Sequence, residues 1–321
     1  MNYKPILIVH GEPNSVFLEI FFKSLRYKKF KNPLVLICSK KILEFQMKKL
    51  GFKIDIKIIS PSSLNKIKLN NKKINIIDIN YNENIQFQKI SDKSNDYIKN
   101  CFETSFKILR SRITNKLING PISKNSFLKK KYLGITEYLT KKTKSNQNAM
   151  LIYNKKLSVC PITTHLPLKL VVKNITKNKI IEKISLIDSF YKKKLGFKPK
   201  IAVLGLNPHC ESIDKFNEDE KIIKTSIKYL SNKKIDVKGP YPADTAFLKK
   251  NRKNIDVIVG MYHDQVLTPI KTLYEYDAIN ITLGLPFVRI SPDHGPNQKM
   301  LGQNKSNPLS LVRAIEFLEK N

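Results

Sequence analysis

The chain has 321 residues, of which 41% are hydrophobic and 9% aromatic. This length and composition suit two α/β lobes or one large domain and exclude a disordered chain. Lysine and arginine number 59 against 26 acidic residues, which gives a formal charge of +33. Because these basic residues are spread along the whole chain and no recognition module accompanies them, the charge does not indicate specific nucleic-acid binding.

Short apolar runs bounded by turn residues alternate with longer segments of helical period, as in a mostly parallel sheet covered by helices. In chain order, the predicted strands cover residues 5–9, 33–38, 54–59, 74–77, 116–119, 150–153, 157–162, 200–206, 255–261 and 278–283. The predicted helices have apolar residues at three- and four-residue spacing and cover residues 15–27, 41–50, 92–112, 179–195, 218–230 and 309–319. The pattern therefore predicts an α/β fold.

The four cysteines are scattered without a CxxC pair, which is typical of a protein in a reducing compartment. The N-terminal apolar run is short and lacks a small-residue cleavage site, and no apolar stretch reaches membrane-spanning length. We therefore expect a soluble, cytoplasmic protein that has no membrane partner.

Three of the five histidines stand close to the ends of predicted strands: His165, His209 and His263. Ligands of open α/β sheets bind at the carboxyl ends of strands, so these imidazoles can converge on one divalent metal. Three neutral nitrogens with an open position suit Zn²⁺ or a similar ion that acts as a Lewis acid. For each histidine taken singly, a hydrogen-bonded or half-exposed side chain without a ligand remains the alternative.

Residues of anion-binding type follow the third histidine, namely Lys271, Asn280 and Arg289. Lysine and arginine pair with carboxylate or phosphate, and an asparagine amide can orient a hydroxyl group. A small phosphorylated or acidic substrate beside a metal is therefore consistent with the sequence, although Lys271 can also be a solvated surface lysine. The chain contains neither GxGxxG nor GxxxxGK[ST], so a nucleotide is not held in the standard Rossmann or P-loop manner.

Short motifs stand in a recognisable order over nearly the whole chain. They are Gly11-Glu12-Pro13, NGPISK at 119–124, TEYL at 136–139, THLPL at 164–168, GLNPH at 205–209, GPYPADT at 239–245, YHDQ at 262–265 and the segment 282–295. This series resembles the 4-hydroxythreonine-4-phosphate dehydrogenase family. The resemblance implies a two-lobed α/β/α architecture similar to isocitrate and isopropylmalate dehydrogenases, with the active site in the cleft. It places the first lobe at residues 1–130 plus about 285–321 and the second at about 131–284.

The resemblance also implies an activity, NAD(P)-linked oxidation of 4-phosphooxy-threonine or a related phosphorylated hydroxy acid followed by decarboxylation, in pyridoxal phosphate biosynthesis. The implied cofactors are NAD or NADP and a divalent cation (Zn²⁺, Mg²⁺ or Co²⁺), and the implied assembly is a homodimer that shares the metal site. By this resemblance, the metal ligands are His165, His209 and His263, and the substrate contacts are Thr136, Lys271, Asn280 and Arg289. The resemblance also implies catalytic or supporting roles for Asp244 and Asp264, and dinucleotide contacts at Asp293, His294 and Gly295.

Three segments differ from the family pattern. The family's Gly-His-Thr-Glu reads Gly134-Ile135-Thr136-Glu137, and the turn at residues 14–18 lacks two glycines. The loop at residues 296–302 reads PNQKMLG, where the family continues with Thr-Ala and then Asp-Ile-Ala-Gly. Two alternatives therefore stay open: a metal-retaining binding or regulatory homologue, and a decarboxylase that does without the nucleotide.

Overall fold

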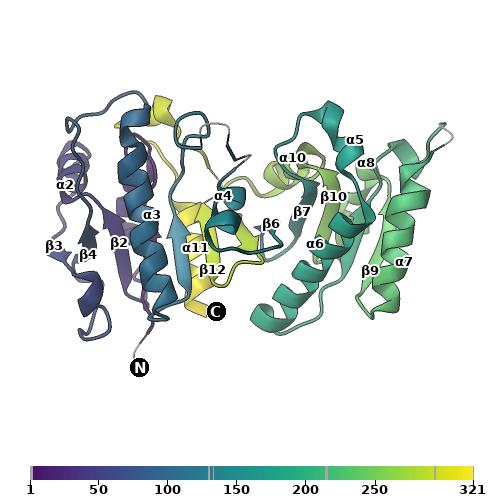
Figure 1. The fold of residues 1–321 in the computed structure, drawn as a ribbon, viewed down its shortest axis with the longest axis horizontal. Helices are drawn as coiled ribbons and strands as arrows, with labels where there is room; N and C mark the ends of the chain where they lie inside the picture. The colour runs from purple at the N-terminus through teal and green to yellow at the C-terminus, as the bar shows by residue number, and fades with distance from the viewer. Residues whose placement is uncertain (1–2, 129–130, 133, 214–215, 293, 321) are drawn as a thin grey trace. The chain divides into compact units, whose positions relative to one another are not determined.

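The computed structural model describes residues 3–128, 131–132, 134–213, 216–292 and 294–320 (Figure 1). The chain divides into two compact units, Met1–Ile135 with Pro286–Asn321 and Thr136–Leu285. Both contain a sheet with helices packed against it, so the predicted α/β fold class is confirmed. Within the described residues, no helix is both long and apolar enough to cross a lipid bilayer.

The first unit is built on a parallel sheet with the strand order β3-β4-β2-β1-β5-β12. All side chains of its central strand β1 are buried, as expected for a strand covered on both faces. Helix α3 lies over one face, while α1 packs with α2 and α11 on the other (Figure 1). The element bounds are β1 Ile6–Val9, α1 Phe17–Tyr27, β2 Leu34–Cys38, α2 Lys40–Lys49, β3 Ile56–Ile58, β4 Ile74–Asp78, α3 Asn95–Arg110, β5 Lys116–Asn119, β12 Val288–Pro292 and α11 Leu309–Lys320.

The second unit has the strand order β11-β6-β7-β10-β8-β9, in which β6 pairs antiparallel with both β11 and β7. Helices α6 and α7 pack together, and α10 packs on β7 and β10 through the buried side chains of Val266, Leu267 and Ile270. The element bounds are α4 Ile135–Lys142, β6 Ala149–Tyr153, β7 Ser158–Thr163, α5 Val171–Asn174, α6 Lys177–Phe190, β8 Ile201–Leu204, α7 Thr225–Asn232, β9 Val237–Tyr241, α8 Ala243–Ala246, α9 Lys249–Arg252, β10 Val257–Tyr262, α10 His263–Tyr274 and β11 Ile279–Leu283.

Elements of the second unit that the hydrophobic pattern did not predict include β9 and α10. Strand β9 contains Gly239-Pro240, a pair that reads as a turn in sequence. Gly239 has φ +136° and a Cβ there would lie 2.4 Å from the Val203 carbonyl oxygen, so the strand needs glycine at this position. Helix α10 begins directly after β10 and contains Pro269, which reads as a helix breaker.

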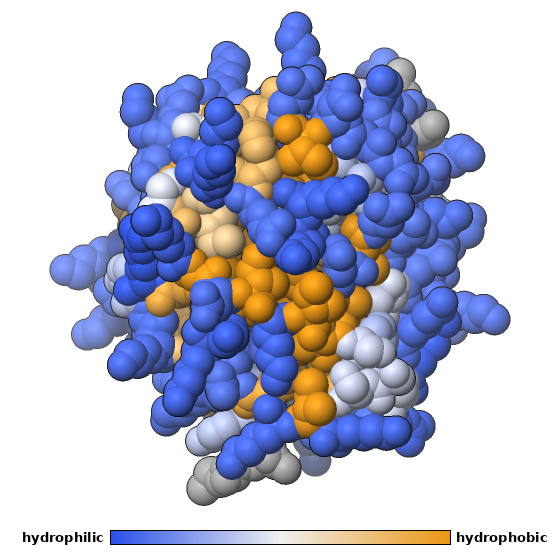
Figure 2. All heavy atoms as spheres, turned by 90° about the vertical axis from the view of Figure 1, so that its left-hand side faces the viewer, coloured by the Kyte–Doolittle hydropathy of each residue, from blue (hydrophilic) through white to orange (hydrophobic). Residues whose placement is uncertain are grey.

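One face of the first unit combines hydrophilic side chains with an exposed apolar area between them (Figure 2). The edge strand β3 lies on this side (Figure 1), and the side chain of its Ile58 is 56% exposed. The strand is only three residues long and has a lysine at its centre, features that limit edge-to-edge pairing of sheets.

Candidate functional site

Two of the three candidate metal ligands lie side by side in the second unit. His165 follows β7 and His263 begins α10 after β10, and these parallel strands pair up to Thr163 and Tyr262. The two imidazole centroids are 5.6 Å apart. Nδ1 of His263 lies 2.6 Å from Oδ1 of Asp264, which leaves Nε2 as the ring nitrogen that can face a ligand.

His209 lies on a different turn of the same unit. It follows β8, which pairs with β10, and it is exposed with φ +55° in the short helical turn Pro208–Cys210. Among the described residues, no three His, Cys, Asp or Glu side chains lie close enough together to hold a metal. Within one chain, the structure therefore brings together His165 and His263 but does not bring His209 to them.

Gln265 connects the strand ends that carry His209 and His263. Its Oε1 accepts a hydrogen bond from the Met261 backbone N–H (2.6 Å), and its Nε2 donates to the Gly205 carbonyl (2.8 Å). This contact holds the first turn of α10 against the end of β8. The sequence contains Gln265 within a family motif, but nothing in its pattern indicated this role.

The candidate substrate residues Thr136 and Asn280 lie on neighbouring elements of the second unit. Thr136, in the first turn of α4, is buried with its Oγ1 3.4 Å from Oγ1 of Thr282 on β11. Asn280 is on the same strand, half-buried, and its Oδ1 has no hydrogen-bond partner among the described residues. The Oγ1 of Thr164 donates to Glu137 of α4 (3.4 Å), so α4 also contacts the segment that carries His165.

Lys271 and Asp244 are both exposed. Lys271 is on α10, eight residues after His263, and Asp244 is the second residue of the short helix α8. The pKa of the Cys210 thiol is raised, mainly by burial and further by Asp219 and Asp244. Asp244 therefore lies close enough to the His209 turn to affect its electrostatics.

Arg289, the anion-binding candidate of the first unit, is not a surface charge. It lies within β12 with 0% of its surface exposed, and its Nε donates to Oδ1 of Asn119 at 2.6 Å. Asn119 ends the neighbouring parallel strand β5 and belongs to one of the family motifs. A buried guanidinium requires hydrogen-bonded partners, which explains the polar Asn119 at the buried end of β5.

The dinucleotide candidates begin a loop of the first unit, and one of them, Asp293, lies outside the described residues. His294 Nδ1 is 2.9 Å from the Gly295 carbonyl oxygen. Gly295 is exposed, and no atom would lie within 4 Å of a Cβ at this position. The start of this loop therefore leaves room for a ligand to approach the backbone.

Two segments that differ from the family pattern, residues 14–18 and 296–302, contact each other in the first unit. The Val16 backbone N–H donates to the Pro296 carbonyl (3.1 Å). Gln88 joins the same two segments, because its N–H donates to Oδ1 of Asn14 (3.0 Å) and its carbonyl accepts from Nε2 of Gln298 (2.9 Å).

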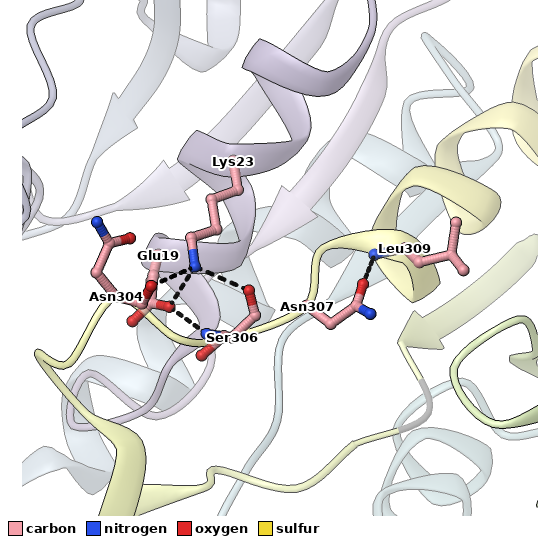
Figure 3. Close-up of polar contacts among 6 residues, drawn as sticks. All are labelled: Glu19, Lys23, Asn304, Ser306, Asn307 and Leu309. Atoms are coloured by element: carbon pink, nitrogen blue, oxygen red, sulfur yellow. Dashed lines mark hydrogen bonds and ion pairs between the residues drawn. The ribbon is translucent and has the colours of Figure 1, made fainter.

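The chain that follows the 296–302 loop is fixed to α1 by the ion pair between buried Glu19 and half-buried Lys23 (Figure 3). Nζ of Lys23 lies 3.0 Å from Oε1 of Glu19 and donates to the carbonyls of Asn304 (2.8 Å) and Ser306 (2.9 Å). The same Glu19 oxygen accepts from the Ser306 N–H (2.6 Å). Both ends of the loop are therefore anchored to the start of α1.

Two buried titratable groups follow β1. Burial lowers the pKa of His10 to about 3, and its Nδ1 lies 2.9 Å from the hydroxyl of Tyr97. Burial raises the pKa of Glu12 to about 7, against the opposing effect of hydrogen bonds from Asn14 and Ser94. Neither shift was predictable from the sequence, because burial of His10 and Glu12 depends on residues distant in the chain.

Comparison with known proteins identifies the family. Residues 29–318 match the family model described as pyridoxal phosphate biosynthetic protein PdxA. The chain belongs to the PdxA family. It is 39% identical over 319 residues to the 4-hydroxythreonine-4-phosphate dehydrogenase of Sulfurihydrogenibium sp., covering 97% of this chain and 96% of that protein. It is also 30% identical over 324 residues to the D-threonate 4-phosphate dehydrogenase of Salmonella typhimurium, covering 99% and 98%. These relatives are oxidoreductases, so the predicted family is confirmed.

Solved structures agree with this assignment. A putative 4-hydroxythreonine-4-phosphate dehydrogenase from Salmonella typhimurium superposes with a TM-score of 0.85 at 29% identity, covering 99% of each chain. A β-decarboxylating dehydrogenase from Thermococcus kodakarensis has a TM-score of 0.54 at 12% identity, covering 98% of this chain and 82% of that chain. The second comparison bears on the fold alone, and it supports the predicted similarity to decarboxylating dehydrogenases.

Proposed function

We propose that this PdxA-family chain is a metal-dependent dehydrogenase that oxidises 4-phosphooxy-threonine with NAD or NADP and then decarboxylates the product, in pyridoxal phosphate biosynthesis. The observation that carries the proposal is the pair His165 and His263, which come from separate strands and lie with ring centroids 5.6 Å apart in a chain of this family. A bound NAD or NADP would supply the hydride acceptor for the substrate's secondary alcohol, whose hydroxyl proton would pass to a base, and the resulting β-keto acid would lose CO₂.

The residues fit a divalent metal at this pair. Imidazole nitrogens are preferred ligands of Zn²⁺ and Co²⁺, whereas Mg²⁺ prefers oxygen, so the donor set favours one of the first two. The Asp264 carboxylate beside His263 Nδ1 would fix the tautomer that presents Nε2, as ligating histidines commonly require. A metal bound there would supply Lewis acidity toward the substrate's oxygen atoms. Asp244 and Asp264 are the nearby carboxylates that we assign to supporting or proton-transfer roles.

A homodimer would supply the third ligand. His209 is exposed and does not join the other two imidazoles within its own chain. Exposed apolar side chains follow both candidate ligand segments, as expected for a surface that a second copy covers. They are Leu168, Leu170 and Val172 after His165, and Ile213 and Phe216 after His209. We therefore propose a metal site shared between two subunits.

The polar residues of each unit suit a phosphorylated hydroxy acid. In the second unit, Asn280 offers an amide oxygen without a partner among the described residues, Thr136 a hydroxyl and Lys271 an exposed ammonium group. In the first unit, Arg289 offers a guanidinium, and the open backbone at Gly295 suits a nucleotide. Charged donors form the stronger hydrogen bonds to carboxylate and phosphate, so Lys271 and Arg289 are the assigned anion contacts.

D-threonate 4-phosphate is a second candidate substrate, because a relative with this activity in its name matches nearly the whole chain. The two candidates share carboxylate, hydroxyl and phosphate groups and differ at C2, which carries an amine in one and a hydroxyl in the other. Ile135 stands next to Thr136 where the family has histidine, so contacts near this position differ from the family pattern.

Absorbance of the reduced nicotinamide tests the proposal. The purified protein would be assayed with each substrate, with NAD or NADP, and with Zn²⁺, Co²⁺ or Mg²⁺; His263→Ala serves as the control that removes one proposed ligand. We expect metal-dependent reduction with one substrate preferred over the other. If neither substrate reduces either nucleotide although the metal binds, the dehydrogenase proposal is wrong. Release of CO₂ from the corresponding β-keto acid without nucleotide would then favour the decarboxylase alternative.

A further inference from the structure

The turn that carries His209 has an unusual backbone. Both His209 (φ +55°) and Cys210 (φ +62°) adopt left-handed conformations, which cost energy in residues other than glycine. The chain just before the turn is also tightly packed, because a Cβ on Gly205 would lie 2.6 Å from Sγ of Cys210 and 2.7 Å from Oδ1 of Asp219. Such a turn keeps its shape only when surrounding groups hold it.

Asp219 is the group that holds it. Its side chain is completely buried and accepts three hydrogen bonds from the two residues that precede the turn. Oδ1 accepts from the Leu206 N–H at 2.7 Å, while Oδ2 accepts from the N–H of Asn207 at 3.1 Å and from its Nδ2 at 2.9 Å. Asp219 itself is fixed at the start of the π-helical segment Asp219–Lys224, where its N–H donates to Oδ1 of Asn217 at 2.9 Å.

We propose that Asp219 is a positioning residue for His209, acting through the 205–210 turn, so that the exposed imidazole is presented in one orientation to a metal. The inference rests on the proposed metal role of His209. An exposed imidazole on an unsupported turn samples many orientations, and the loss of that freedom opposes metal binding. Three hydrogen bonds from Leu206 and Asn207 to one buried carboxylate restrict the backbone that leads to His209, and so reduce this freedom before the metal arrives.

A carboxylate suits this position better than an amide. Both oxygens of Asp219 face N–H donors, so an asparagine at this position would direct its NH₂ group at a donor and lose at least one of the bonds. The predicted consequence is a looser His209 turn within a folded protein.

Cobalt titration of the full-length protein tests the proposal through the visible absorption of Co²⁺ bound to imidazole. The principal variant is Asp219→Asn. Asn207→Ala is a milder variant that removes the side-chain bonds to Oδ2 of Asp219 (2.9 Å) and to Oε2 of Glu218 (3.4 Å) and keeps both backbone bonds to Asp219. Glu220→Gln is the matched control, because Glu220 is the next residue, exposed, and paired with Lys224 away from the turn. His209→Ala removes the proposed imidazole ligand and shows how far Co²⁺ affinity falls without it.

We expect Asp219→Asn to lower Co²⁺ affinity about tenfold to a hundredfold and to alter the absorption bands, with a smaller loss for Asn207→Ala and none for Glu220→Gln. If Asp219→Asn does not fold, Asn207→Ala decides the question. Unchanged affinity and bands in the folded variants, even with a lower melting temperature, would overturn the positioning role alone. Absence of Co²⁺ binding to the unsubstituted protein, or binding that His209→Ala leaves intact, would instead overturn the metal centre of the proposed function and this inference with it.

Discussion

Replacing Glu12 by glutamine tests the electrostatics of the first unit. Glu12 follows β1 with 0% of its surface exposed, its backbone N–H donates to the Pro121 carbonyl, and its Oε1 accepts from the Asn14 N–H at 3.2 Å. Glutamine has nearly the same shape, keeps an oxygen for the Asn14 contact and cannot ionise. The substitution therefore removes the charge with little change in packing.

The magnitude follows from the raised pKa, from 4.5 to about 7. Between these values the folded protein binds more protons at Glu12 than the unfolded chain, so the stability contributed by this group is present below pH 4.5 and is lost as the pH rises to 7. This rise in pKa of about 2.5 corresponds to about 3 to 4 kcal/mol at most, at about 1.4 kcal/mol per pKa unit. We expect Glu12→Gln to match the unsubstituted protein near pH 4.5 and to be more stable by up to about this amount at pH 8.

Urea unfolding at several pH values measures the difference in the free energy of unfolding between Glu12→Gln and the unsubstituted protein. The control is Glu44→Gln, at an exposed position of α2. The contribution of His10 to stability has the opposite pH dependence. Because its pKa is lowered from 6.5 to about 3, its contribution is present above pH 6.5 and is lost as the pH falls toward 3. This term is common to both proteins and cancels in their difference. A stability difference between Glu12→Gln and the unsubstituted protein that is the same at pH 5 and pH 8 would refute the reasoning.

Other predictions concern the second unit and the substrate contacts. Alanine at His165, His209 or His263 should each reduce bound metal well below that of the unsubstituted protein by elemental analysis, and full stoichiometry in all three would contradict the assignment. Light scattering in metal-replete buffer should give a dimer, and a monomer would exclude a shared site. Lys271→Ala should weaken phosphate or substrate-analogue binding about tenfold to a hundredfold with an unchanged melting temperature, because Lys271 is exposed. Arg289→Ala should lower both affinity and melting temperature, since the side chain is buried; a change in melting temperature alone would limit Arg289 to supporting Asn119.

Hydrophobic pattern was sufficient for much of the fold because buried parallel strands such as β1 are continuous apolar runs. It failed where local signals opposed the tertiary structure. Gly239-Pro240 reads as a turn but lies inside β9, where close approach to Val203 requires glycine. Pro269 reads as a break but lies inside α10, which packs on its sheet through Val266 and Ile270. In both places, packing outweighs local propensity.

The candidate site was predictable only in its residue types. Strand-end position predicted that His165, His209 and His263 converge, and the structure brings His165 and His263 together because the strands before them are parallel neighbours. The same reasoning could not separate His209, since the direction of a turn after a strand depends on contacts such as those of Asp219. It also could not distinguish buried Arg289 from an exposed cation, because burial depends on residues distant in sequence.

The departures at residues 14–18 and 296–302 are separate in sequence but linked in the structure, because Gln88 bonds to Asn14 through its N–H and to Gln298 through its carbonyl. If the segments depend on each other, Asn14→Ala and Gln298→Ala should each cost about 0.5 to 1.5 kcal/mol, and the double variant should differ from their sum by at least about 0.5 kcal/mol. Urea unfolding of the three variants completes the cycle, and simple additivity would show that the segments are independent. If the two segments are coupled, their departures from the family pattern are one observation, and not two, in favour of the alternative that the chain has lost its dinucleotide.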